Sequence, residues 1–297
     1  MFMARHERSA RHLRHSTLER RYDFHLGEAI RAALQGRHDK AAGHSGRALL
    51  ISRELCADAG PARHKPELAA ALCAYAQYSG ARQEIEMLTE SAGHYATLAE
   101  ADPAAYEVPR IDVLTRIAVA SDAAGSTRDA ISLLRDVVGM YLKAPAANAD
   151  ERDLSLARAR FHLGHCLLKT GMSEDGLAET EAGLELAADV LDRMQPQGAG
   201  PGWLTGAPRY LQLAAPDWAA AAARCMALHA EARRWQQAAT AARAAIVVSG
   251  GLAELGGDTL RDAHEKLSAR AAEILAKDGV ARRVARPMAK AAIVSGA

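Results

Sequence analysis

The stretch FHLGHCLLK, residues 161–169, brings together side chains that could do chemistry. His162 and His165 are three residues apart, a spacing at which two histidines on one helix face could share a metal ion. Cys166 could act as a nucleophile with His162, four residues before it, as its base. Zinc needs further ligands and a nucleophile needs an oxyanion hole, and the sequence nominates neither. We therefore expect Cys166 to pack and His165 to face a groove, with no metal, cofactor or catalytic residue.

Other motifs with a chemical meaning do not fit their required context. The segment GAGPG at 198–202 lacks the third glycine of a dinucleotide fingerprint and follows a helical pattern rather than a strand. The segment GHSG at 43–46 is not a GxSxG nucleophile elbow, and no P-loop pattern occurs. We therefore do not expect an enzyme.

The composition favours helices. Of the 297 residues, 49% are hydrophobic, 25% are charged and only 4% are aromatic, in an Ala-, Leu- and Arg-rich background. These are strong helix formers, whereas strands favour β-branched and aromatic residues. The four cysteines are widely spaced without a metal-binding pattern, which is typical of reduced, buried thiols. The N-terminus lacks the apolar region of a signal peptide, and no run approaches the roughly 18 apolar residues of a membrane span. These features predict a soluble, cytoplasmic protein without a membrane partner.

A spacing of small residues around Gly171 recurs along the chain. Gly164 lies seven residues before this glycine, and Gly176 and Gly183 lie five and twelve residues after it. The same offsets fit four other places, and the first matched positions follow one another at separations of 44, 45, 46 and 62 residues. The five predicted turns lie at Gly36, Gly80, Gly125, Gly171 and Arg233.

Each repeat reads as a helix, a tight turn and a second helix. Small residues on a fixed face allow two antiparallel helices to approach closely, and glycine at the turn supplies the C-cap conformation. Leu177, Leu184 and Leu191 continue an apolar stripe along the second helix of the fourth repeat. A single hairpin cannot bury its hydrophobic face, so neighbouring hairpins must stack.

The pattern LARARFHLGHCLLKTGMSEDGLAETEAGLELA resembles a tetratricopeptide (TPR) repeat, as do LQGRHDKAAGHSGRAL and EARRWQQAATAARAA. The resemblance covers roughly residues 23–250, but the period is about 45 residues against 34 in that family. It implies an all-α, right-handed α-solenoid of about five TPR-like hairpins, with residues 258–279 as a C-terminal capping helix. The chain is similar to degenerate TPR-like arrays of actinobacterial type, where such repeats are common in regulatory proteins.

The predicted organisation has three parts. Residues 1–22 form a basic N-terminal arm or helix, residues 23–275 the repeat domain, and residues 276–297 a basic tail. A Gly- and Pro-rich insertion interrupts the repeats at about 195–217. Trp203 and Tyr210 suggest that this insertion packs against the repeats, while a partner-contacting lid and disorder remain open.

The two ends of the chain are basic although the formal net charge is only +1, so the body between them is acidic. Arg5, Arg8, Arg11 and Arg14 recur every third residue and form a basic surface on a helix. Such a surface attracts anionic partners. Aromatic residues for base stacking are absent from it, however, so we favour docking on the acidic body or solvation over nucleic-acid binding.

The expected function is a non-catalytic, regulatory scaffold or adaptor that binds a protein or peptide. The TPR resemblance implies a concave groove lined by the first helix of each repeat, and its mixed cationic and aromatic character would suit an acidic peptide. A sensor that responds to a peptide or small-molecule ligand is the alternative, and an enzyme with the 195–217 insertion as its lid is a third. The oligomeric state is left open. Carried over to this sequence, the groove positions are Tyr78, Thr115, Arg158, Phe161, His165 and Lys169.

Overall fold

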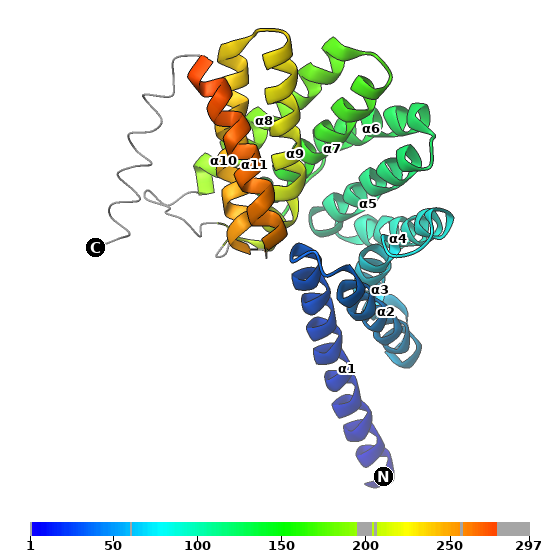
Figure 1. Ribbon diagram of the computed structural model, residues 1–297. Coiled ribbons are helices and arrows are strands. Elements are labelled where there is room, and N and C mark those ends of the chain that lie inside the picture. Colours follow the sequence, from blue (N-terminus) through cyan, green and yellow to red (C-terminus); the bar gives the residue numbers. More distant parts are fainter. Residues whose placement is uncertain (1, 60, 195–203, 205–206, 256–257, 278–297) are drawn as a thin grey trace, which may run out of the picture. The chain divides into compact units, whose positions relative to one another are not determined.

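The computed structural model describes residues 2–59, 61–194, 204, 207–255 and 258–277. These residues form eleven helices and no strand, which confirms the predicted all-α class. The helices are α1 (Phe2–Leu34), α2 (His38–Ala59), α3 (Pro61–Ala76), α4 (Ala81–Ala101), α5 (Pro103–Ala123), α6 (Thr127–Tyr141), α7 (Ala149–Lys169), α8 (Ser173–Met194), α9 (Arg209–Glu231), α10 (Trp235–Leu255) and α11 (Asp258–Lys277). They fall into two compact units, which we call unit 1 (Met1–Ala147, α1–α6) and unit 2 (Asn148–Ala297, α7–α11) (Figure 1).

All five predicted turns separate two consecutive helices. Gly36, Gly125 and Gly171 have φ values of 69°, 92° and 84°, the left-handed conformation that glycine adopts without strain. The amide of Gly171 donates to the carbonyl of Leu168, and the next amide reaches back to Leu167. This pair of bonds satisfies the last carbonyls of α7, as predicted for a glycine C-cap.

The turn at Arg233 has the same form without a glycine. Arg233 has φ 58°, and its amide donates to the carbonyl of Ala230 while the amide of Arg234 donates to His229. A side chain with a Cβ atom is strained in this conformation. The turn is therefore set by the two flanking helices rather than by the residue at its tip.

The turn at Gly80 differs from the prediction. Gly80 has φ −65° and ψ 152°, so it is the extended N-cap of α4 and not the C-cap of α3. Helix α3 ends at Ala76, and two consecutive tight turns follow, with the amides of Tyr78 and Ser79 donating to Tyr75 and Ala76. A glycine is not required here, because any residue adopts extended backbone.

The small residues predicted to lie between paired helices are buried in four of the five hairpins. They are Ala29, Ala41, Ala48, Ala118, Ala130, Val137, Gly164, Gly176, Gly183, Met226, Ala238 and Ala245. In the hairpin α3–α4 the predicted positions Cys73, Ile85 and Ala92 are only half-buried. The buried residues there include Ala69, Leu72, Ala76, Leu88 and Ser91.

Glycines bring the backbones of α7 and α8 into contact. A Cβ atom on Gly164 would lie 2.6 Å from the carbonyl oxygen of Gly176, and one on Gly176 would lie 2.8 Å from the carbonyl oxygen of Gly164. On Gly183 it would lie 2.7 Å from Cε1 of Phe161. No side chain fits these spaces, so the helix pair requires glycine at all three positions.

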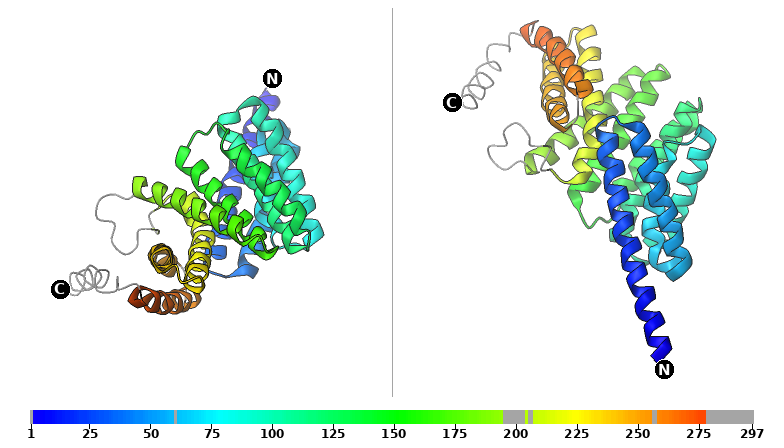
Figure 2. Two further views of the ribbon diagram at one scale, coloured as in Figure 1. Left: turned by 90° about the horizontal axis from the view of Figure 1, so that it is seen from above. Right: turned by 60° about the horizontal axis from the view of Figure 1, so that its bottom comes forward.

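In unit 1 each helix packs on the next along the chain, from α1 to α6 (Figures 1 and 2). Helix α1 continues without a break through the predicted boundary between the basic arm and the first repeat, and Figure 2 shows it extending beyond α2. Leu18 and Tyr22, on the arm side of that boundary, are buried with Leu55 and Leu72. Arg14 pairs with Glu54 at 2.6 Å, so this part of the arm docks on α2. The side chains of residues 1–13 lie outside the described residues.

In unit 2, α7 packs on α8 and α9, and α9 packs on α10. Helix α11 packs on α10 and also contacts α9, so the last predicted helix covers the final hairpin as expected. Its Ile274 and Leu275 are buried with Ala238 and Ala242 of α10. The basic tail from residue 278 on lies outside the described residues.

The predicted insertion is shorter than 195–217, because α9 already begins at Arg209. Pro216 lies inside α9 and is exposed. The residues before it are helical nevertheless, although proline lacks the amide hydrogen of a regular helix. Leu204 is fully buried, and Gln212 of α9 donates to its carbonyl at 3.1 Å. The insertion therefore packs on unit 2 at this residue. Trp203 and the side chain of Tyr210 lie outside what is described.

By length and composition alone, α10 could cross a membrane. No other helix in the described part of the chain meets these two criteria. Half of the most apolar window of α10 is buried, and the helix packs between α9 and α11. Ala238, Ala242 and Ala245 on its buried face have no exposed surface. This burial is typical of a core helix.

Candidate binding surface on helix α7

Four of the six predicted groove residues lie on α7. The helix starts at a defined N-cap, where the Asn148 side chain accepts from the amides of Asp150 and Glu151 at 3.1 and 3.3 Å. The acidic side chains in its first turn and Lys169 in its last turn interact favourably with the helix dipole. Both ends of α7 are thus fixed locally, which sets the direction of its side chains.

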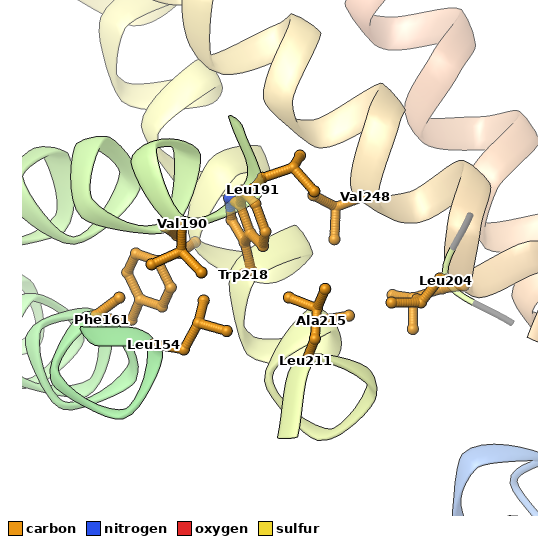
Figure 3. Close-up of a cluster of buried hydrophobic side chains, with 13 residues drawn as sticks. Leu154, Phe161, Val190, Leu191, Leu204, Leu211, Ala215, Trp218 and Val248 are labelled. Atoms are coloured by element: carbon orange, nitrogen blue, oxygen red, sulfur yellow. The ribbon is translucent and has the colours of Figure 1, made fainter. Parts of the chain in front are cut away.

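One face of α7 belongs to the core of unit 2. Phe161 is 3% exposed and lies beside Leu154 and Val190 in a cluster that also contains Trp218 (Figure 3). Its ring rests on Gly183 of α8, where a larger residue would displace it. Phe161 therefore packs between helices, and its ring is not presented on an open surface.

A polar face of α7 is directed at α9. Nε of Arg158 donates to Oδ2 of Asp217 at 3.0 Å, and Nε2 of His162 lies 3.7 Å from the same oxygen. All three side chains are between a fifth and a third exposed. A charged hydrogen bond of this kind holds its partners in one geometry, so Asp217 orients Arg158 along the edge of α7, with His162 beside it.

The charge of Asp217 is favoured at neutral pH. Burial alone raises the pKa of its carboxyl, but the proximity of His162 and the positive charge of Arg158 outweigh this effect, and the pKa lies below its usual range. The carboxylate is thus ionised and available to both partners under physiological conditions.

The end of α7 carries the remaining predicted residues. His165 and Lys169 are exposed, and together with Arg158 and His162 they recur at i, i+4, i+7 and i+11, which places them along one side of a helix. Arg224 follows Asp217 by seven residues on α9 and is half-buried. We call the residues Arg158, His162, His165 and Lys169 the cationic stripe of α7.

Two of the four cysteines, Cys166 and Cys225, are buried as predicted, whereas Cys56 and Cys73 are only half-buried. Cys166 is 3% exposed, as predicted, and its neighbour His165 points outward. Cys225 is 1% exposed, and burial raises the pKa of its thiol to about 12. A thiol with such a pKa is a poor nucleophile, because the thiolate is the reactive form.

The other two predicted groove residues belong to unit 1. Tyr78 lies in the turn after α3 rather than on a helix, and burial raises the pKa of its hydroxyl while Arg116 opposes the shift. Thr115 of α5 is 4% exposed, and its hydroxyl donates to the carbonyl of Ile111 at 3.0 Å. Thr115 is therefore a core residue whose hydroxyl is satisfied within its own helix. That the six residues share one groove stays a prediction.

A second cluster of chemical side chains was not identified from the sequence. His15 and Glu19 of α1 and His64 of α3 bring three potential ligand atoms within 4.8 Å of one another. His15 and Glu19 are four residues apart, so the sequence alone shows that they can share one helix face. Many helix pairs without a metal have the same spacing, so it does not identify a site. His64 is separated from them by 45 residues or more, so only the packing of α1 on α3 joins the three.

A search against protein-family models and a search of curated proteins each found no match to this chain.

Proposed function

We propose that the chain is a TPR-like α-solenoid whose cationic stripe on α7 binds an acidic segment of a protein or peptide. Support for the TPR-like classification comes from the five helical hairpins and the repeated C-cap turns. The glycine contact between α7 and α8 adds to it, because that family places small residues at the same positions. In this proposal the protein is a regulatory scaffold without catalytic activity that acts in the cytoplasm.

The observation that carries the binding proposal is the division of α7 into two faces. The apolar and small residues of α7 form its buried face. The stripe, on the other face, has two exposed and two half-buried side chains that are cationic or become cationic on protonation. Asp217 is the carboxylate that lies against Arg158 and His162 of the stripe. A surface of this sign attracts carboxylates and repels basic segments.

The side chains of the stripe also suit carboxylate binding in detail. Arg158 presents a planar guanidinium, the group best matched to a carboxylate, and Asp217 holds its position before a ligand arrives. His165 and Lys169 reach solvent on the following turns. The proposal therefore retains Arg158, His165 and Lys169 from the predicted groove, adds His162, and assigns Phe161 and Thr115 to the core.

The test is a peptide library displayed on a surface and probed with the full chain, with acidic, neutral and basic members of equal length. We expect acidic peptides to be selected, and a double variant His165→Glu, Lys169→Glu to weaken their binding by tenfold or more. Arg243→Glu is the matched control, because Arg243 is equally exposed but lies on α10. It should leave the affinity within twofold.

Two results would contradict the proposal. Selection of basic or purely apolar peptides would show that the stripe does not determine the ligand. Equal loss of affinity in the Arg243 control would show that only the net charge of the protein matters. A small molecule found bound to the purified chain by native mass spectrometry would favour a ligand-responsive sensor instead.

A further inference from the structure

The three side chains His15, Glu19 and His64 converge on one point between α1 and α3. Nε2 of His15 lies 2.7 Å from Nε2 of His64 and 3.4 Å from Oε1 of Glu19. Both histidines are buried, at 9% and 1% exposure, whereas the Glu19 side chain is 38% exposed. We propose that this cluster binds a divalent transition metal ion, with Zn²⁺ as the reference ion, and that the ion fastens α1 to α3.

The backbone places these ligands before any ion binds. His15 and Glu19 occupy successive turns of α1, and Leu18 between them is buried in the core of unit 1. The hydroxyl of Tyr22, one turn further, donates to the carbonyl of Glu67 at 2.9 Å. These contacts fix the face of α1 that is turned to α3, so the two ligands on α1 need little reorganisation.

His64 is positioned by an interruption of α3. Its backbone has φ −114° and ψ 17°, which is not helical, and Pro66 follows two residues later. Proline lacks the amide hydrogen of a regular helix and its ring clashes with the preceding turn, which explains the interruption. The carbonyl of His64 accepts from Sγ of Cys56 at 3.5 Å. The ring of His64 is thereby held against α1.

The surroundings of His64 also favour the tautomer that binds a metal. Nδ1 of His64 lies 3.5 Å from Oε1 of Glu67, and both this nitrogen and Oε2 of Glu67 are buried without a hydrogen-bond partner. A carboxylate beside Nδ1 favours the proton on that nitrogen, which leaves the lone pair on Nε2 facing His15 and Glu19. Metal-binding histidines are oriented by a carboxylate in this way.

The distances require a small expansion. Two nitrogen ligands of a tetrahedral zinc ion, each about 2.05 Å from the metal, lie about 3.3 Å apart. The contact between His15 and His64 must therefore open by about 0.6 Å, while the distance between His15 and Glu19 already fits. Without a metal ion, the two imidazoles form a direct hydrogen bond in which one nitrogen donates its proton to the other.

The donor set selects the class of metal. Two imidazoles and one carboxylate suit zinc and its neighbours among the transition metals better than magnesium or calcium, which prefer oxygen ligands. Arg63 lies 3.6 Å from Oε1 of Glu19, but its side chain is 64% exposed and can turn away when an ion binds. Three protein ligands leave one tetrahedral position for water. The proposal is independent of peptide binding at α7, which lies in unit 2.

The experiment titrates the full chain, produced without a polyhistidine tag and treated with a chelator, with Zn²⁺ by calorimetry and with Co²⁺ by visible absorption. We expect one ion per chain and a rise in melting temperature, because the ion binds only the folded state. His64→Gln should weaken binding more than 100-fold. Glu67→Gln should weaken it about 10- to 100-fold, the usual effect of losing a carboxylate that orients a metal ligand.

A second histidine pair in the same unit provides the control. Nδ1 of His25 lies 3.0 Å from Nδ1 of His44, but no third ligand completes a cluster there in the described residues. The chain has 12 histidines, so weak binding elsewhere must be separated from binding at the proposed site. His44→Gln should leave the stoichiometry and affinity unchanged.

Either of two results would overturn the proposal: no Zn²⁺ bound by the wild-type chain, or unchanged affinity in His64→Gln. If His64→Gln does not fold, Glu19→Gln decides, because Glu19 is partly exposed and glutamine keeps its length. Loss of at least tenfold in affinity in a folded Glu19→Gln protein supports the site. Full affinity in that variant would show that Glu19 is not a ligand and would overturn the proposed three-residue site.

Discussion

The hairpins α7–α8 and α3–α4 fulfil the same role in their units but are built differently. In α7–α8 the turn is a glycine in the left-handed conformation, and three further glycines bring the helix backbones into contact. In α3–α4 the turn glycine is extended, a Cβ atom on Gly80 would meet nothing within 4 Å, and larger side chains fill the interface.

This difference explains why only one of the two follows the predicted register. A contact between backbones admits only glycine at fixed positions, so it leaves a spacing in the sequence that can be recognised. A contact between side chains is satisfied by many residue types, so it does not fix one residue spacing in the sequence. In α3–α4, Leu88 and Ser91 are buried, whereas the predicted Ile85 and Ala92 are only half-buried.

The largest expected effect tests the backbone contact directly. Gly176→Ala should destabilise unit 2 by about 3 kcal/mol, because the new methyl group meets backbone atoms that cannot move without separating α7 from α8. All three tryptophans of the chain, at 203, 218 and 235, belong to unit 2, so denaturant unfolding followed by tryptophan fluorescence reports on this unit.

Gly250→Ala is the matched control for this substitution. Gly250 lies inside α10, where a Cβ atom would make only an ordinary contact of 3.5 Å with His264. We expect stabilisation by about 0.5–1 kcal/mol from the higher helix propensity of alanine. Equal destabilisation by both substitutions would contradict the glycine-mediated contact.

The next effect concerns the polar contact between α7 and α9. Asp217→Asn should destabilise unit 2 by about 1–2 kcal/mol, because Arg158 loses a charged hydrogen-bond partner. The folded state lowers the pKa of Asp217, so its contribution is complete above the unfolded pKa of about 3.9 and is lost as the pH falls towards the folded value. The difference between wild type and variant should be constant from pH 5 to 8 and shrink below about pH 4.

Asp262→Asn on α11 serves as its control. Asp262 pairs with Lys266 at 2.7 Å, but both side chains are more than 60% exposed, and such pairs contribute little. Fluorescence unfolding should detect almost no change in this variant. A pH-independent difference for Asp217→Asn would show that its ionisation is not what stabilises the contact.

Opposite signs are expected at the two turn glycines. Gly171→Ala should destabilise its unit by about 1 kcal/mol, because alanine is strained at a positive φ. Gly80→Asp should stabilise α4 by about 0.5 kcal/mol, since an aspartate at an extended N-cap accepts an amide of the first turn. Slower hydrogen exchange in the first turn of α4 would confirm the stabilisation by Gly80→Asp. Slower hydrogen exchange in α8 after Gly171→Ala would contradict the expected destabilisation.

The smallest effect is predicted at the turn that lacks a glycine. Arg233→Gly should stabilise unit 2 by about 0.5 kcal/mol, because relief of the left-handed strain exceeds the added flexibility of the unfolded chain. The midpoint of fluorescence unfolding should therefore increase. A decrease would indicate that contacts of the Arg233 side chain outweigh its backbone strain.

The all-α class and the turns at Gly36, Gly125 and Gly171 could be predicted because they depend on local features, namely helix propensity and a glycine that adopts a positive φ. The end of the insertion could not, because α9 begins at Arg209 and includes Pro216 where local rules disfavour a helix. The packing of α9 on α7 and α10 supports this segment, and packing of that kind is invisible in a local pattern.

The candidate surface was predicted only in part. His165 and Lys169 are exposed, as a groove residue requires. The ring of Phe161, in contrast, is buried in the core, where it packs against Gly183 of α8. Asp217 could not be paired with Arg158 from the sequence, because 59 residues separate them. Long-range pairs of this kind need the structure.

The most direct test of the binding proposal is hydrogen exchange of the full chain with and without a selected acidic peptide. We predict slower exchange in residues 158–169 of α7 and in the part of α9 around Asp217, with no change in α3–α4. Protection confined to α3–α4, or none in α7 at a saturating peptide concentration, would contradict the account.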